Sequence, residues 1–163
     1  MNNEQKPIGF FPGSFDPPTK GHFAIVQAVI PLFSRLVIGI GQNSQKTCSW
    51  STTMRKEMLE AMFQDMPSIK VIIYQGLTID AAAEVDAHYL IRGIRDEKDS
   101  AYERQIAEAN KALLPHIETI FVPSPTGAAH INSSIVREIH KHGGNVRPFI
   151  HEHIWRFFDN TPL

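Results

Sequence analysis

The chain has 163 residues, of which 42% are hydrophobic, so it can bury the core of one ordinary domain and has no room for a second. Its formal net charge of −1 does not indicate a general electrostatic attraction to nucleic acid. The single cysteine, Cys48, excludes an internal disulfide and a CxxC metal site, while the polar start at 1–6 and the absence of a long apolar run predict a cytoplasmic protein without a membrane span.

The first half of the chain alternates between short apolar runs and amphipathic segments. The apolar runs predict three strands, at 7–11, 36–40 and 69–74. Between them, a helical pattern runs from about residue 21 to 30, and a second one follows Ser51 or Thr52, either of which can cap it. An alanine-rich stretch at 78–84 predicts a short third helix.

The second half continues the same alternation. Strands are predicted at 89–91, where Arg92-Gly93 ends the run, and at 119–122. The expected helices cover 99–114, 133–140 and 148–158. Strands that alternate with helices predict a single α/β domain over 1–163, with a doubly wound, Rossmann-like, five-stranded parallel sheet and a C-terminal helix.

Polar residues gather where the predicted strands end. In doubly wound sheets ligands bind beyond the carboxyl ends of the strands, near the point where the strand order reverses. The loops after Phe11, Ile40, Ile91 and Val122 are therefore expected on one rim of the sheet. This convergence predicts a binding site at that rim.

The loop after the first strand, at 9–22, has the composition of an anion site. Gly13 permits a tight turn, Ser14 offers a hydroxyl and a backbone N–H, and Gly21-His22 stands at the start of a helix, where free N–H groups favour an anion. His22 could donate to phosphate oxygens as their charge increases in a transition state. The alternative is a plain loop in which His22 only caps the helix.

Several motifs resemble one enzyme family. Thr19-Lys20-Gly21-His22 is similar to the TxGH signature of nucleotidylyltransferases, and the longer string from Pro12 to His22 resembles the phosphopantetheine adenylyltransferases in particular. The resemblance covers the chain from about Phe10 to His153 and continues through Leu90-Ile91-Arg92-Gly93-Ile94-Arg95, Tyr102-Glu103-Arg104-Gln105 and Ile131-Asn132-Ser133-Ser134-Ile135-Val136.

The resemblance implies a reaction and its partners. It implies transfer of the adenylyl group of ATP to 4'-phosphopantetheine, giving dephospho-coenzyme A and pyrophosphate, with Mg²⁺ on the triphosphate and no metal site made by the protein. It also implies a homohexamer and feedback inhibition by coenzyme A. One alternative is an adenylyl- or cytidylyltransferase for another phosphate, such as nicotinamide mononucleotide or glycerol phosphate. A second is a nucleotide-binding regulatory module without catalysis. An aminoacyl-tRNA synthetase fragment shares the Gly-His chemistry, but the chain is short, lacks a KMSKS-like loop and has no basic surface for tRNA.

The resemblance also assigns residues to the acceptor side. It implies that His22 stabilises the transferring phosphate, that Arg92 holds the phosphate of the acceptor, and that Lys46 contacts both, with Ser14 beside them. Leu77 and Thr78 are expected to line the pantetheine arm, although Thr78 could instead cap a helix. Without the resemblance, Lys46 would be a surface lysine, and the arginines at 92 and 95 would be solvated or paired with Asp96 and Glu97.

On the nucleotide side, the resemblance implies contacts with ATP from Ser14, Phe15, His22, Gly93, Ile94, Arg95, Glu103, Asn132, Ser133 and Ser134, with Glu103 near the ribose or base. The chain departs from the family pattern in three places, one of which is the stretch Gly127-Ala128-Ala129-His130, which lacks the aromatic residue often found there. Thr47 follows Lys46 where the family commonly has a second lysine, and Asn132 replaces the first of three serines.

Overall fold

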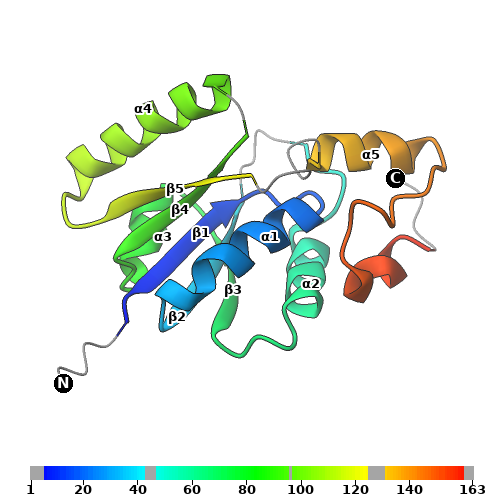
Figure 1. Ribbon diagram of the computed structural model, residues 1–163, viewed down its shortest axis with the longest axis horizontal. Helices are drawn as coiled ribbons and strands as arrows, with labels where there is room; N and C mark the ends of the chain where they lie inside the picture. Colours follow the sequence, from blue (N-terminus) through cyan, green and yellow to red (C-terminus); the bar gives the residue numbers. More distant parts are fainter. Residues whose placement is uncertain (1–5, 43–46, 96, 125–130, 160–163) are drawn as a thin grey trace.

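The computed structural model describes residues 6–42, 47–95, 97–124 and 131–159, with the side chain of Lys98 excepted. These residues form a five-stranded parallel sheet in the order β3-β2-β1-β4-β5 (Figure 1). The strands are β1 (Ile8–Gly13), β2 (Arg35–Gly41), β3 (Ile69–Tyr74), β4 (Tyr89–Ile94) and β5 (Glu118–Pro123). The expected Rossmann-like fold is therefore confirmed, and the strand order reverses between β1 and β4.

The two neighbours of β1 pair with it to different extents. The ladder with β2 runs from Ile8 opposite Arg35 to Gly13 opposite Ile40. The ladder with β4 contains only Gly9 opposite Tyr89 and Phe10 opposite Leu90. Main-chain pairing between β1 and β4 is thus confined to their amino-terminal halves, and the sheet opens toward their carboxyl ends.

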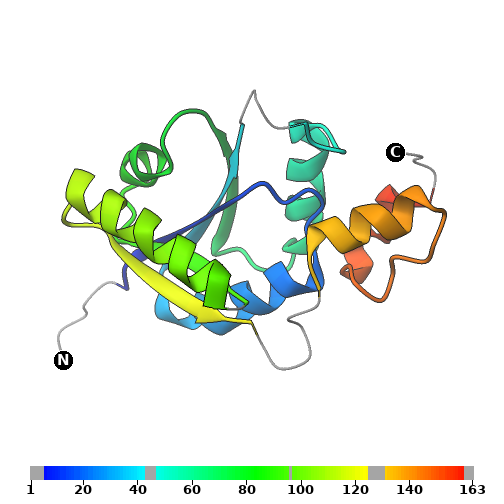
Figure 2. The same cartoon turned by 90° about the horizontal axis from the view of Figure 1, so that it is seen from above.

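Helices cover both faces of the sheet (Figures 1 and 2). One face carries α1 (Lys20–Val29), which continues into a 3₁₀ turn at Ile30–Leu32, and α2 (Thr52–Met62). The short helix α3 (Thr78–Glu84) lies on the opposite face, and α4 (Glu97–Leu113) runs alongside β5. The remaining helices are α5 (Ser133–Lys141) and the 3₁₀ helix η2 (Glu152–Phe157).

The core is divided by the sheet into two clusters. Successive side chains of a strand point to opposite faces, so Phe11 packs with α1 and α2 while Phe10 packs with α3. Both are at most 4% exposed. Because both faces are covered, the central strands are apolar throughout and do not alternate, as parallel sheets require.

Two expected elements differ from the observed ones. β4 continues through Arg92 and Gly93 to Ile94, because β5 supplies a parallel partner for each of these residues. Gly93 is needed in the strand, because a Cβ there would lie 2.5 Å from Cδ1 of Ile25.

The final helix is also shorter than expected. It was expected at 148–158 but forms only as η2, a 3₁₀ helix over 152–157. The preceding residues 147–149 form a turn that is bound to the start of α1, since the backbone N–H of Lys20 donates to the Phe149 carbonyl at 2.9 Å and the Lys20 ammonium donates to the Pro148 carbonyl at 2.9 Å. Across the described ranges, no helix is long and apolar enough to cross a membrane.

Candidate active site

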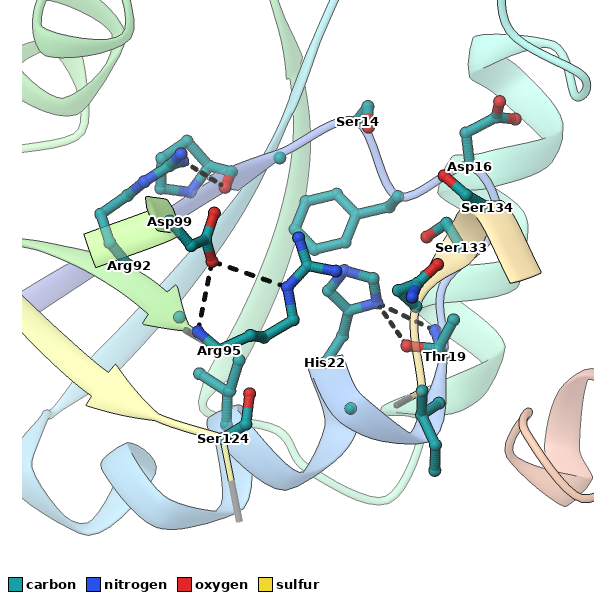
Figure 3. A pocket seen from close by; sticks show the side chains of 18 of the residues that line it. Ser14, Asp16, Thr19, His22, Arg92, Arg95, Asp99, Ser124, Ser133 and Ser134 are labelled. Carbon is teal, nitrogen blue, oxygen red and sulfur yellow. Dashed lines mark hydrogen bonds and ion pairs between the residues drawn. The ribbon is translucent and has the colours of Figure 1, made fainter. Parts of the chain in front are cut away.

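A cleft of about 470 Å³ opens where β1 and β4 separate (Figure 3). Its walls come from the loop between β1 and α1, the first turn of α1, Thr47 and Cys48, the ends of β4 and β5, the first two turns of α4, and the start of α5. The strand-end rim predicted from the sequence is thus the location of the cleft. Of the expected site residues, the cleft brings together Ser14, Phe15, His22, Arg92, Gly93, Arg95, Glu103, Asn132, Ser133 and Ser134.

The loop after β1 is fixed from within by an aromatic side chain. Phe15 has a φ of 48°, a conformation that residues other than glycine seldom adopt, and its ring is 2% exposed. The ring packs edge-on against Phe11 at 5.4 Å and against His22 at 5.0 Å between centroids. Phe15 therefore supports the imidazole, and the part of Phe15 suited to a polar ligand is its backbone.

The His22 ring is oriented by the residue that caps its helix. His22 is the third residue of α1, where a capping box would have Glu or Gln, and its Nδ1 accepts the backbone N–H of Thr19 at 3.0 Å. Because Nδ1 is the acceptor, the proton of a neutral ring lies on Nε2. Burial, followed by the nearby Arg95 guanidinium, lowers the pKa of His22 from 6.5 to about 4. At neutral pH the ring is thus an uncharged donor.

Arg95 and Asp99 flank this histidine. The Arg95 guanidinium lies beside the imidazole, and the Asp99 carboxylate accepts the Arg95 backbone N–H at 3.2 Å (Figure 3). Asp99 Oδ2 also lies 3.6 Å from Arg95 Nε. Because 45% of the Arg95 side chain is exposed, its guanidinium is available to an anion in the cleft.

Arg92 and Glu103 form a second arginine–carboxylate pair at the cleft. Arg92 Nε donates to Glu103 Oε2 at 2.6 Å, its Nη2 donates to the other carboxylate oxygen, and its Nη1 donates to the Pro12 carbonyl at 3.2 Å. The alternative expectation that Arg92 pairs with Glu97 is therefore wrong. The other expected partner, Asp96, lies outside the described residues. Glu103 is 7% exposed, so its carboxylate orients Arg92.

The start of α5 supplies the opposite wall. Asn132 caps the helix by accepting the Ile135 N–H at 3.0 Å. The Ser133 hydroxyl donates to the Pro17 carbonyl at 2.8 Å, while the Ser134 hydroxyl accepts from Arg137 Nη2 at 2.9 Å. The helix therefore presents its positive dipole end, two hydroxyls and a guanidinium to the cleft.

Sequence reasoning missed four charged residues, the first of which is Asp99, described above with Arg95. Arg137 lines the cleft and forms an ion pair with Asp16 at 3.7 Å, and Asp16 accepts the backbone N–H groups of Ser49 and Trp50, both at 2.9 Å. Arg55, in α2, holds the Ser14 carbonyl. Arg137 could have been found from its position three residues after Ser134, on the same side of a helix. Asp16 lies within the motif from Pro12 to His22, and nothing local in the sequence singles out Arg55.

Three other expected site residues, Ile94, Leu77 and Thr78, are not part of the cleft lining. Ile94 lines a neighbouring hollow with Arg95 and Ser124. Leu77 is the N-cap of α3 and is 57% exposed, so the expectation that Thr78 caps this helix is wrong. The Thr78 hydroxyl instead lies 2.9 Å from the Tyr74 hydroxyl. Lys46 falls outside the described residues, and its neighbours Thr47 and Cys48 line the cleft.

The carboxylates of the cleft do not form a metal centre. Among the described residues, no group of three or more His, Cys, Asp or Glu side chains has the arrangement of metal ligands. Asp16, Asp99 and Glu103 each interact with an arginine instead. A cation in this cleft would therefore need most of its ligands from a bound anion and water.

Known proteins resemble the chain in sequence and in fold. The sequence model of the cytidylyltransferase-like family matches residues 10–139. A phosphopantetheine adenylyltransferase of Flavobacterium johnsoniae is 46% identical over 134 residues, which cover 82% of this chain and 88% of that protein. One of Cytophaga hutchinsonii is 41% identical over 143 residues, covering 88% and 95%.

A solved structure is similar in fold. The chain matches a Vibrio parahaemolyticus protein described as a nicotinate-nucleotide adenylyltransferase with a TM-score of 0.73, over 96% of this chain and 100% of that one. The two sequences are 15% identical, so this likeness shows the fold alone.

Proposed function

Because the chain belongs to the phosphopantetheine adenylyltransferase family, we propose that its cleft joins the adenylyl group of ATP to 4'-phosphopantetheine. The products are dephospho-coenzyme A and pyrophosphate, in the synthesis of coenzyme A. The observation that supports this best is the neutral, oriented imidazole of His22 in a cleft rich in cations and hydroxyls. Such a site suits the transfer of a phosphorus group between two anionic molecules.

The reaction exchanges one phosphorus–oxygen bond for another. An oxygen of the acceptor phosphate attacks the α-phosphorus of ATP, and the bond from this phosphorus to the β-phosphate oxygen breaks, so pyrophosphate leaves with the electron pair. The attacking phosphate is largely ionised at neutral pH and needs no strong base. The protein's contribution is alignment of the two substrates and stabilisation of the charge that develops between them.

His22 is the residue proposed to act at the α-phosphate. Its Nδ1 is occupied by the Thr19 N–H, so its Nε2–H is the group that can donate to a non-bridging phosphate oxygen. The hydrogen bond strengthens as charge builds on that oxygen in the transition state. A neutral ring serves this purpose, because it remains a donor throughout and transfers no proton.

The acceptor phosphate is proposed to lie between Ser14 and Arg92. Two of the five N–H bonds of Arg92 are directed at Glu103 and one at Pro12, which leaves two for a ligand. Glu103 thus holds the guanidinium in one orientation while phosphate binds its free edge. Lys46 is proposed as the additional cation here, and Leu77 and Thr78 as contacts of the pantetheine arm.

ATP is proposed to bind between β4 and α5. Its phosphates would lie near the Phe15 backbone, His22, Arg95 and the start of α5, where Asn132, Ser133 and Ser134 stand. Gly93 and Ile94 would contact the nucleoside, with Glu103 near the ribose or base. Mg²⁺ would be carried by the triphosphate and water, which agrees with carboxylates that already interact with arginines, and it would neutralise the leaving pyrophosphate.

The assembly and regulation are proposed from the same family relationship. We propose that the enzyme is a cytoplasmic homohexamer and that coenzyme A inhibits it by feedback. Light scattering of the purified protein tests the first statement, because a hexamer has six times the mass of the 18.4 kDa chain. Inhibition of the assay below by coenzyme A tests the second.

The function is tested by measuring pyrophosphate release from ATP and Mg²⁺ with 4'-phosphopantetheine, with nicotinamide mononucleotide and with no acceptor. Release only with 4'-phosphopantetheine, and detection of dephospho-coenzyme A by mass, is the expected result. Release with nicotinamide mononucleotide instead would reassign the acceptor. ATP binding without release in any of the three reactions would contradict an enzymatic function.

A further inference from the structure

Arg55 is a buried arginine that binds only uncharged groups of the described chain. It is 3% exposed in α2, and its three nitrogens donate to the Trp50 carbonyl at 3.1 Å, the Ser14 carbonyl at 2.5 Å and the Thr52 hydroxyl at 3.0 Å. Within the ranges that the structure describes, Arg55 takes part in no ion pair with a carboxylate.

A buried charge without a counter-ion is unusual. Removing a guanidinium from water costs several kcal/mol, and proteins generally compensate with a paired carboxylate or a bound anion. The guanidinium stays charged, so it cannot escape this cost by losing a proton. Three neutral acceptors take three of its five N–H groups, and no carboxylate of the described residues pairs with its charge. The part of the cleft that Arg55 contacts is the Ser14 loop.

The contact with Ser14 determines the direction of one peptide group. In a trans peptide the C=O and the following N–H point in opposite directions. Because the Ser14 carbonyl points at Arg55, the Phe15 N–H points away from α2, toward the side of the loop that lines the cleft. Phe15 holds a positive φ of 48°, which costs free energy and requires support from its surroundings. The Arg55–Ser14 hydrogen bond provides such support.

Asp16 also connects the loop after β1 to the segment before α2, and here the side chain comes from the loop. Its carboxylate accepts the N–H groups of Ser49 and Trp50, while Arg55 donates to the Trp50 carbonyl and to the loop that carries Asp16. The segment before α2 and the loop after β1 are therefore joined through two charged side chains, Asp16 from the loop and Arg55 from α2. Thr47 and Cys48, which line the cleft, precede this junction directly.

We propose that Arg55 is a positioning residue for adenylyl transfer: it fixes the Ser14–Phe15 peptide so that the Phe15 N–H faces a substrate phosphate, and its positive charge, which pairs directly with no described carboxylate, favours that phosphate. This inference rests on the proposed function. Arg55 itself does not line the cleft, so it acts through the loop and through its electrostatic field.

The test compares Arg55→Lys and Arg55→Ala with the control Arg35→Ala. Arg35 is an exposed arginine at the amino-terminal end of β2, away from the cleft, so its removal changes the net charge equally. Wild-type pyrophosphate release with 4'-phosphopantetheine is measured first. Steady-state kcat and both KM values are then measured for each variant, together with its melting temperature and folded fraction by circular dichroism.

Arg55→Ala is expected to lower kcat about 100-fold, a loss comparable to that of one donor to a developing anion. Arg55→Lys keeps the charge but cannot reach all three acceptors, so its kcat is expected about tenfold below wild type. Guanidinium ion at millimolar concentration should partly restore the Ala variant, whereas urea, which is uncharged and similar in shape, should not. The control should match wild type.

A purely structural role predicts a different pattern. The Arg55 variants would then melt at lower temperature, but their folded fraction would show wild-type kcat and KM, and guanidinium would have no specific effect; this result would overturn the proposal. If the Ala variant does not fold, the Lys variant decides by the same criterion. An inactive wild-type protein would refute the proposed function itself, and the inference with it, before any variant is assayed.

Discussion

Glu103 holds Arg92 by two hydrogen bonds across the connection between β4 and α4, and the carboxylate is the more buried partner of the two. The side chain of Glu103 is 8% exposed, compared with 27% for Arg92. The buried anion therefore determines where the guanidinium can go. The arginine that is proposed to bind the acceptor is oriented before any substrate arrives.

The Arg92–Glu103 pair predicts that the stability of the protein and its affinity for the acceptor can be changed separately. Arg92→Ala should raise the acceptor KM and also destabilise the protein by about 3–5 kcal/mol, because it leaves the Glu103 charge buried without a partner. Adding Glu103→Gln should recover much of the stability but none of the acceptor affinity. Urea denaturation and steady-state kinetics measure the two effects. Arg35→Ala, at an exposed position at the amino-terminal end of β2, serves as the control. An unchanged acceptor KM in Arg92→Ala would rule out its role.

His22→Ala should reduce kcat by about 10²–10³ while ATP affinity changes little, because the Nε2–H bond strengthens chiefly in the transition state. Single-turnover kinetics and equilibrium binding of ATP separate these two quantities. His116→Ala, at an exposed histidine in the turn after α4, should leave both unchanged. A variant of His22 with wild-type kcat would exclude the mechanism proposed above.

The lowered pKa of His22 predicts how stability depends on pH. Its folded-state pKa of about 4 lies below the ordinary 6.5, so between these values the unfolded chain binds a proton that the folded protein does not. The stabilisation is therefore fully present above pH 6.5 and is lost as the pH falls toward 4, by roughly 3 kcal/mol in all. Urea denaturation at pH 7.0 and 5.0 should show a smaller loss for His22→Gln than for the wild type. Equal losses would show that His22 is not the group responsible.

Arg137→Met should raise the KM for ATP about tenfold and change kcat less, because the side chain lines the nucleotide wall next to Ser134. Arg156→Met, an exposed arginine in η2, is the control. Because Arg137 also contacts the backbone of Asp16, the melting temperature of each variant should be compared. A KM for ATP equal to that of the wild type would place Arg137 outside the nucleotide site.

The strands and most helices could be predicted because their signals are local. The apolar runs at 36–40 and 69–74 correspond closely to β2 and β3, and Ser51 caps α2 by accepting the Met54 N–H as its sequence position suggests. The final helix could not be predicted, because its start depends on the bonds between Lys20 and the segment at 147–149. No short stretch of the sequence contains both Lys20 and this segment.

The candidate site also contains residues that local signals locate and contacts that depend on distant segments. The strand ends and the family motifs locate Ser14, His22, Arg95 and Ser134 on one rim, where the structure has them. The partners of the charged groups could not be predicted, because Asp16 and Arg55 form hydrogen bonds with backbone groups more than 30 residues away in the sequence. For Arg92, local reasoning considered the acids that follow it directly, whereas the fold brings in Glu103 from the second turn of the next helix.

The short ladder between β1 and β4 has a mechanical consequence. The sheet consists of two groups of strands, β3-β2-β1 and β4-β5, each joined internally by long ladders and to each other by only two residue pairs. At the cleft, the side chain of Arg92 spans the gap to Pro12 in place of main-chain pairing. A small rotation about the Gly9–Phe10 end would therefore change the width of the cleft while both groups stay rigid. Substrates that bind to both strand groups would draw them together at the cleft, where the new bond forms.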